Sequence, residues 1–153
     1  VVIATNGYTS DLWPELRQSI VPVYSMQVAT NPLSRNIRQT ILPEGEVLSD
    51  TRRILWYFRQ DSHGRLIMGG GGSGYKIGTE KIYKELRERI RTLLPQSVNV
   101  DFKYSWYGKI AVTPDSLPRL HNLAPGLWAG LGYNGRGVAM ATMMGKILWR
   151  GKN

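Results

Sequence analysis

The sequence predicts an α+β fold: a mixed, largely antiparallel sheet with one long covering helix, joined to the terminal strand and helix elements of an α/β domain. Three observations predict it. Several segments alternate apolar and polar residues, as strands with one buried face do. Residues 79–94 show the clearest helical period of apolar residues. The chain also opens on an apolar β-branched run and closes on a glycine-rich turn that leads into a helix.

The opening run, Val1 to Ala4, has apolar residues at successive positions. This pattern is typical of a strand buried on both faces in a parallel sheet, and parallel strands need βαβ neighbours. We therefore expect neighbouring strands upstream of Val1. After this run, residues 11–18 are expected to form a short helical turn with Ser10 as its N-cap and Pro14 in its first turn.

The middle of the chain is predicted to form the antiparallel sheet. Residues 20–30 alternate and end at Asn31-Pro32, and residues 33–46 are expected to form a loop. Residues 53–59 and 65–69, joined by the turn 61–64, have the pattern of a β-hairpin. The glycine run 69–74 fits a phosphate-binding loop or, more simply, a flexible linker, since it lacks the Gly-Lys-Ser/Thr ending of a P-loop.

The long helix is expected to begin at Thr79 as a cap and to end at Pro95. A further strand is predicted over residues 98–106, with Val98, Val100, Phe102 and Tyr104 on one face. Residues 106–118 contain too many turn formers for one element. A short strand over 127–131 and a helix over 137–149 close the chain. The predicted inward face of the long helix consists of Ile82, Leu86, Ile90, Leu93 and Leu94.

Composition excludes several classes of protein. The chain has 153 residues with no cysteine and two separate histidines, so disulfides and thiolate metal sites are excluded and no metal site is predicted. No apolar run approaches the length of a membrane span, and the lack of cysteine is compatible with the cytoplasm. The net charge of +9 raises the alternative of a basic module that binds nucleic acid or protein. The basic residues are scattered, however, which is more typical of a solvated surface.

The segment Gly132 to Ala139 carries the candidate chemistry. Three glycines precede a helix that follows an apolar strand, so a flat ligand could approach the bare backbone at the positive end of the helix. A glycine turn that only packs the helix against the strand explains the spacing equally well.

Five motifs in order resemble one family. They are Ala4-Thr5-Asn6-Gly7-Tyr8, Val21-Pro22-Val23, Gly64-Arg65-Leu66-Ile67-Met68-Gly69-Gly70, Trp106-Tyr107-Gly108 with Thr113-Pro114-Asp115 and Pro118, and the closing glycine turn. On these motifs the chain resembles the FAD-dependent oxidoreductases of the D-amino-acid oxidase, glycine oxidase and sarcosine oxidase type. The resemblance implies that residues 1–19 end an FAD-binding domain, 20–105 form a substrate-binding domain, and 106–153 return to the FAD-binding domain.

The resemblance also implies a cofactor, a reaction and a set of site residues. The family removes a hydride from a C–H bond beside an amine of an amine or amino-acid substrate, passes it to FAD, and leaves an imine that water hydrolyses. No side-chain base is needed if the amine is neutral, so no catalytic residue is assigned. Tyr57, Lys109 and Tyr133 are expected to border the substrate. The expected cofactor-binding residues are Thr5, Asn6, Gly7, Gly108, Gly132, Tyr133, Asn134, Gly135, Arg136, Gly137 and Val138.

The sequence departs from the family pattern at three places. Ile110 and Ala139 stand where relatives place a carboxylate-binding arginine or lysine, with Lys109 and Arg136 as candidate replacements. The Gly-x-Gly-x-x-Gly turn of a dinucleotide-binding domain is missing. We therefore expect the missing N-terminal part of the same protein to supply most of the FAD site, and the 153 residues alone to bind FAD weakly or not at all. Pairing with another copy as a homo-oligomer is an alternative way to cover exposed sheet edges.

Overall fold

The computed structural model describes residues 1–52, 55–71 and 79–150, and the chain divides into two compact units. Unit 1 contains residues 1–23 and 109–153, and unit 2 contains residues 24–108. Two long strands, β2 (Val21–Pro32) and β6 (Phe102–Val112), run through both units. Residues 72–74 of the predicted glycine run 69–74, and Arg53-Ile54 of the predicted hairpin strand, lie outside the described residues. Gly69 to Gly71, the first half of that run, belong to a strand, β5.

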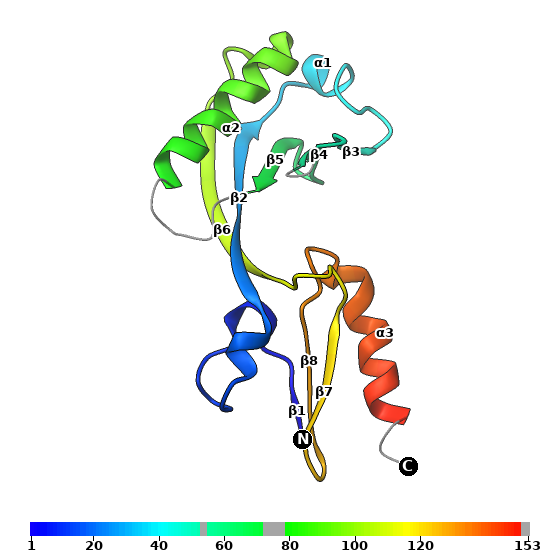
Figure 1. Cartoon of the computed structure of the whole chain (residues 1–153). Coiled ribbons are helices and arrows are strands. Elements are labelled where there is room, and N and C mark those ends of the chain that lie inside the picture. The colour runs from blue at the N-terminus through cyan, green and yellow to red at the C-terminus, as the bar shows by residue number, and fades with distance from the viewer. Residues whose placement is uncertain (53–54, 72–78, 151–153) are drawn as a thin grey trace. The chain divides into compact units, whose positions relative to one another are not determined.

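Unit 2 is built on a five-stranded sheet of order β3-β4-β5-β2-β6. The pairs β3–β4, β4–β5 and β5–β2 are antiparallel, as the sequence predicts for the hairpin and its neighbours. α2 lies across one face of this sheet (Figure 1). The elements of unit 2 besides the two long strands are α1 (Arg35–Arg38), β3 (Val47–Ser49), β4 (Trp56–Gln60), β5 (Arg65–Gly71), α2 (Thr79–Leu93) and a 3-10 turn (Pro95–Ser97).

The core of unit 2 lies between α2 and the sheet. Met26, Val28, Leu66 and Met68 point from β2 and β5 towards α2 and are at most 1% exposed. The helix contributes Tyr83, Leu86 and Ile90 in the i, i+3, i+7 pattern of a buried stripe. Leu93, which the sequence predicts on that stripe, is 49% exposed instead, because it lies one residue off the row that ends at Leu94.

Unit 1 contains a three-stranded sheet of order β1-β8-β7, in which β1 is parallel to β8 and β7 is antiparallel to β8. β1 pairs in parallel with β8, as expected for the opening run, and forms the edge of the described sheet, where Val1 and Val2 are exposed. The small core of this unit includes Leu16, Ile20, Ala129 and Leu131. The elements besides the two long strands are β1 (Val2–Ile3), 3-10 turns at Asn6–Tyr8 and Leu16–Ser19, β7 (Arg119–Ala124), β8 (Leu127–Leu131) and α3 (Gly137–Arg150).

Four local expectations are corrected by the structure. The helical turn predicted at 11–18 is a 3-10 turn at Leu16–Ser19 preceded by Glu15 at φ +64°. The predicted loop 33–46 contains α1, which Ser34 caps through its side chain. β6 begins at Phe102 and continues through Gly108 to Val112, since glycine is tolerated within a paired strand. β7 is a further strand, whose alternation over only six residues was too short to stand out from the surrounding turn formers.

The face of β6 also differs from the prediction. Phe102 packs against the core under α2, as predicted. Tyr104 is 42% exposed and lines a hollow with Ala29 and Ile67, which alternate with the core residues of β2 and β5 and therefore point to the other face of the sheet. Strict period-2 alternation therefore fails between residues 102 and 104.

Candidate functional site

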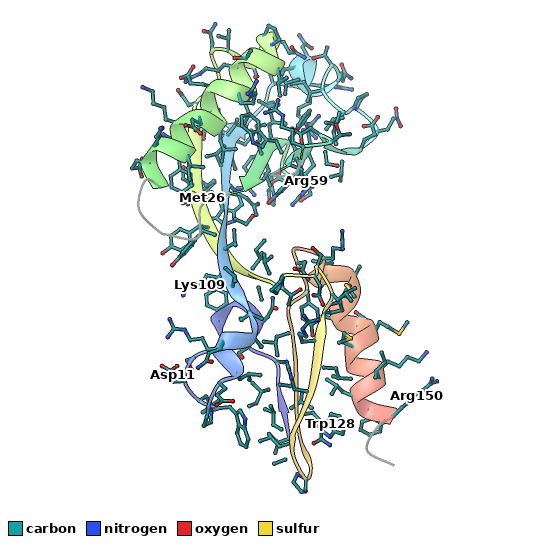
Figure 2. The ribbon with its side chains drawn as sticks, in the orientation of Figure 1. Asp11, Met26, Arg59, Lys109, Trp128 and Arg150 are labelled. Atoms are coloured by element: carbon teal, nitrogen blue, oxygen red, sulfur yellow. The ribbon has the colours of Figure 1, made fainter. Side chains whose placement is uncertain are left out.

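Three chain segments that are far apart in the sequence meet within unit 1. They are the opening segment 5–8, the end of β6 at 109–113, and the closing turn 132–137. The amide of Lys109 donates a hydrogen bond to the hydroxyl of Tyr8 (3.2 Å), and the amide of Gly132 donates to the side-chain oxygen of Asn6 (3.1 Å). The amide of Asn134 donates to the carbonyl of Ala111 (2.9 Å). Figure 2 marks Lys109 where β6 passes the opening segment.

Backbone contacts this close require glycine at two positions. A Cβ built on Gly7 would lie 2.5 Å from the carbonyl oxygen of Lys109, which is backbone and cannot move aside easily. Gly132 has φ +78°, and a Cβ there would lie 2.6 Å from the Thr113 methyl group. The opening Thr-Asn-Gly motif and the closing glycine turn therefore both pack closely against the end of β6.

Asn134 holds the closing turn in place. Its backbone has φ +52°, a left-handed conformation that asparagine tolerates better than most residues. Its side-chain oxygen accepts a hydrogen bond from the amide of Thr113 (2.8 Å), and its side-chain nitrogen donates to the carbonyl of Gly132 (2.6 Å). Thr113 is only 2% exposed, so its amide depends on this partner. The Asn134 side chain is thus used inside the protein, and its part in the site is to shape the backbone.

Tyr133 turns inward from the same bend. Its hydroxyl lies 3.1 Å from the position of a Cβ on Gly130, and its ring lies 3.7 Å from that of Gly137 at the start of α3. Burial raises the pKa of the Tyr133 hydroxyl above its ordinary value. The ring therefore packs between β8 and α3.

The outer edge of the turn is open backbone at the start of a helix. Gly135 has φ +83°, and a Cβ there would meet only Ile110, at 3.9 Å. Gly135 and Arg136 are exposed, and Val138 is 100% exposed. The first turn of α3 contains no acidic residue, so its N–H groups and its positive dipole end face outward without a carboxylate to neutralise them. This edge is suited to an electron-rich, planar ligand group.

The predicted substrate residues lie in both units. Tyr57 belongs to unit 2, where its ring lies flat over Gly69 on the neighbouring strand and its hydroxyl is 3.2 Å from that of Ser25. Lys109 and Tyr133 belong to unit 1, and the Lys109 amine lies 5.5 Å from the centre of the Tyr8 ring. Gly108 is the last residue of unit 2 and lies within β6, and Thr5 bonds Thr9 through their hydroxyls (2.8 Å).

Two polar residues that the sequence did not mark as site residues support the closing turn. The Thr113 hydroxyl donates to the carbonyl of Leu117 (2.8 Å), and Arg119 forms a 2.9 Å ion pair with Asp115. The hydrogen bond from Arg119 holds the pKa of the Asp115 carboxyl below its usual value. The Thr-Pro-Asp motif was the available signal, because Thr and Asp before and after proline commonly bond to nearby backbone.

The described part of the chain contains neither a metal-binding cluster nor a membrane-spanning helix. Within residues 1–52, 55–71 and 79–150, no three histidine, aspartate or glutamate side chains are grouped closely enough to hold a metal ion. The helices in these ranges are all too short or too polar to cross a membrane.

The open glycine edge and the helix start without an acidic residue are compatible with a planar, electron-rich ligand, and comparison with known proteins identifies the family. Residues 1–150 match the family model of the FAD-dependent oxidoreductases. The chain therefore belongs to the FAD-dependent oxidoreductase family, as the five motifs predict.

Relatives agree with this assignment. The probable oxidoreductase OrdL of Haemophilus influenzae is 31% identical over 97% of the chain, which spans 34% of that protein. Gamma-glutamylputrescine oxidoreductase of Escherichia coli K12, to which the motifs are also similar, is 25% identical over 97% of the chain, which spans 35% of the enzyme. The chain thus spans about a third of the length of the relatives that it matches.

Solved structures confirm the fold. The L-proline dehydrogenase from P. horikoshii is 26% identical with a TM-score of 0.65, and the match covers 97% of this chain and 41% of that one. The glycine oxidase from Bacillus cereus is 18% identical with a TM-score of 0.72 and the same coverage. The predicted α+β class, with its largely antiparallel sheet, is therefore confirmed.

Proposed function

We propose that this chain is the C-terminal part of an FAD-dependent oxidoreductase that oxidises the C–N bond of an amine or amino acid. Unit 1 completes the FAD-binding domain, and unit 2 is the substrate-binding domain. The missing N-terminal part of the same protein supplies the dinucleotide-binding turn. The family match over residues 1–150 supports the cofactor, and the coverage of about a third of each relative supports a longer parent protein.

The observation that carries the proposal is the shape of the closing turn. Asn134 holds the backbone in a left-handed conformation, Gly135 leaves open space where a side chain would stand, and the first turn of α3 contains no acidic residue. These features fit one edge of the planar ring of FAD. When bound, FAD supplies the acceptor for a hydride taken from the carbon beside the substrate nitrogen.

Each part of the site has a separate task. The N–H groups at the start of α3 favour the electron-rich edge of the ring, because they are aligned and already fixed before the reaction. Asn6 and Gly7 fix the turn by bonding and packing against Gly132 and Lys109. Tyr57 offers a flat aromatic surface on unit 2 for the substrate. Hydride removal needs no side-chain base if the amine is neutral, and water then hydrolyses the imine product.

Several aromatic rings of unit 2 are already covered by its own basic side chains, which weakens the alternative of a nucleic-acid-binding module. Arg89 lies 4.2 Å from the centre of the Trp56 ring, and Arg91 lies 5.5 Å from that of Phe102. Rings that stack on bases must be accessible. The basic-module hypothesis therefore rests on the net charge alone.

The test is made on the full-length protein that contains this chain. The purified protein should show the absorption bands of bound FAD, and these should bleach when an amine or amino acid of the right class is added without oxygen. A panel of primary amines, N-methyl amino acids and cyclic amino acids identifies the class. A full-length protein that neither binds FAD nor is bleached by any member of the panel would contradict the proposal.

A further inference from the structure

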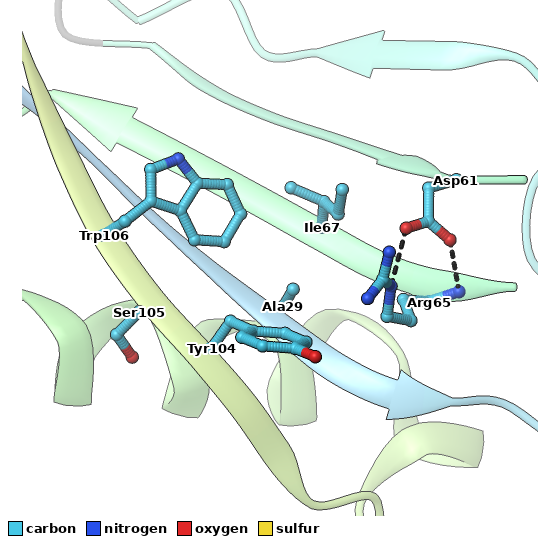
Figure 3. Close-up of a pocket in the computed structure, with 7 residues that line it drawn as sticks. All are labelled: Ala29, Asp61, Arg65, Ile67, Tyr104, Ser105 and Trp106. Carbon is cyan, nitrogen blue, oxygen red and sulfur yellow. Dashed lines mark hydrogen bonds and ion pairs between the residues drawn. The ribbon is translucent and has the colours of Figure 1, made fainter. Parts of the chain in front are cut away.

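A hollow on the open face of the unit 2 sheet combines one arginine with an apolar floor. Val28 and Met68 point to α2, so their neighbours Ala29 and Ile67 point to the opposite face. Tyr104 and Trp106 of β6 form one wall (Figure 3). We name this the Arg65 hollow; its lining includes Ala29, Asp61, Arg65, Ile67, Tyr104 and Trp106.

Asp61 fixes the arginine and has little capacity left for another ligand. Its carboxylate accepts hydrogen bonds from the amides of His63 (3.0 Å) and Arg65 (2.9 Å) and from the Arg65 Nε (2.7 Å). Although burial opposes ionisation, the hydrogen bonds from Arg65 and His63 hold the pKa of Asp61 below its ordinary value. The carboxylate therefore stays charged and acts as an anchor within the turn.

Arg65 keeps donors to spare. A guanidinium has five N–H groups. One goes to Asp61, one faces the His63 ring nitrogen at 3.3 Å, and one faces Tyr104. At least two N–H groups therefore have no acceptor among the described residues. The Arg65 side chain is 26% exposed, so these donors are accessible from the hollow.

We propose that the Arg65 hollow binds the carboxylate of a small organic molecule whose aliphatic part lies against Ile67, Tyr104 and Trp106. Two N–H groups of one guanidinium can bond both oxygens of a carboxylate, which a neutral amide cannot match. The proposal rests on the proposed function, in that the molecule is the amine substrate. It adds one binding residue to that function, Arg65, whose guanidinium holds a carboxylate carried by the substrate.

The first experiment measures binding without turnover. Pentanoate and pentanamide, which differ only in the charged group, are titrated into the full-length protein by calorimetry. Pentanoate should bind at least tenfold more tightly than pentanamide. In Arg65→Gln the affinity for pentanoate should fall by about 10- to 100-fold, while the affinity for pentanamide stays unchanged. The pentanoate affinity of Arg65→Lys should lie between those of the parent and Arg65→Gln, because an ammonium keeps the charge but cannot make the paired bonds.

The matched control is Arg59→Gln. Arg59 is a cation on the same sheet, opposite Ile67 in the strand register, but it does not line the hollow. The Arg59→Gln substitution removes the same charge as Arg65→Gln and should leave the affinity for pentanoate within twofold of the parent. Equal binding of pentanoate and pentanamide, or an equal loss in Arg59→Gln and Arg65→Gln with both variants folded by circular dichroism, would overturn the proposal.

Turnover separates this proposal from the proposed function. With 5-aminopentanoate as substrate, Arg65→Gln should raise KM at least tenfold while kcat stays within threefold, and the KM for 5-aminopentanamide should not change. Carboxylate-specific binding without oxidation of any amine would support the Arg65 hollow and contradict the oxidoreductase activity. Oxidation of 5-aminopentanoate with the same KM in parent and Arg65→Gln would contradict the Arg65 hollow and leave the activity standing.

Discussion

Replacement of Asn134 by alanine should destabilise the closing turn strongly. The change leaves the buried amide of Thr113 without its 2.8 Å acceptor and removes the donor to the Gly132 carbonyl. An unsatisfied buried amide costs about 1–3 kcal/mol. Alanine at φ +52° adds roughly 1 kcal/mol of backbone strain. The free energy of unfolding should therefore fall by about 3 kcal/mol in all.

Asn134→Gly separates the two causes. Glycine loses the same hydrogen bonds but adopts a positive φ without strain, so it should be about 1 kcal/mol more stable than alanine at this position. The measurement is urea unfolding of the full-length protein, followed by circular dichroism and by release of FAD. If both variants unfold within 0.5 kcal/mol of the parent, roughly the size of an ordinary surface substitution, Asn134 does not hold the turn as described.

Three further perturbations have defined outcomes. Gly69→Ala places a Cβ against the hydroxyl end of the Tyr57 ring, closer than van der Waals contact allows. It should cost about 1–3 kcal/mol by overpacking, but much less when combined with Tyr57→Ala; unfolding free energies that simply add across this double-mutant cycle would contradict the packing. Gly7→Ala should cost a similar amount, measured in the same unfolding assay, because its Cβ meets the Lys109 carbonyl; a neutral result would contradict the close approach. Asp61→Asn should lower stability at neutral pH by about 1–3 kcal/mol. Because the folded pKa of Asp61 lies below the ordinary value of an aspartate, the difference from the parent should be full near neutral pH and shrink as the pH falls through the folded pKa. A difference of unchanged size in acid, where the Asp61 carboxyl of the folded parent is protonated, would contradict the role given to this carboxylate.

The sequence predicted elements best where a period extended over many residues. α2 and β2 have long apolar patterns, and the structure places them within two residues of the expected bounds. β7 and α1 are short, and local pattern alone could not separate them from turns. The path of β6 through Gly108 depends on pairing with β2, which is a tertiary contact that no local propensity records.

In the candidate site, too, local patterns were visible in the sequence and long-range contacts were not. The glycine turn at 132–137 was visible in the sequence because glycine and asparagine mark left-handed backbone. Its support was not visible, since Asn6 and Gly132 are 126 positions apart and meet only after folding. The Arg65 hollow likewise brings together β2, β5 and β6, and no spacing within one segment predicts which of the scattered arginines lies beside the aromatic residues of another strand.

In the proposed function, the start of α3 receives the electron-rich edge of FAD. Val138 is fully exposed there, and Val138→Asp adds a carboxylate that favours the helix itself by about 0.3–1 kcal/mol. The decisive measurement is the FAD dissociation constant of full-length Val138→Asp against its neutral counterpart Val138→Asn. We expect Val138→Asp to bind FAD at least tenfold more weakly than Val138→Asn, although its unfolding temperature should be equal or higher. Equal FAD affinity in the two variants would contradict this placement of FAD.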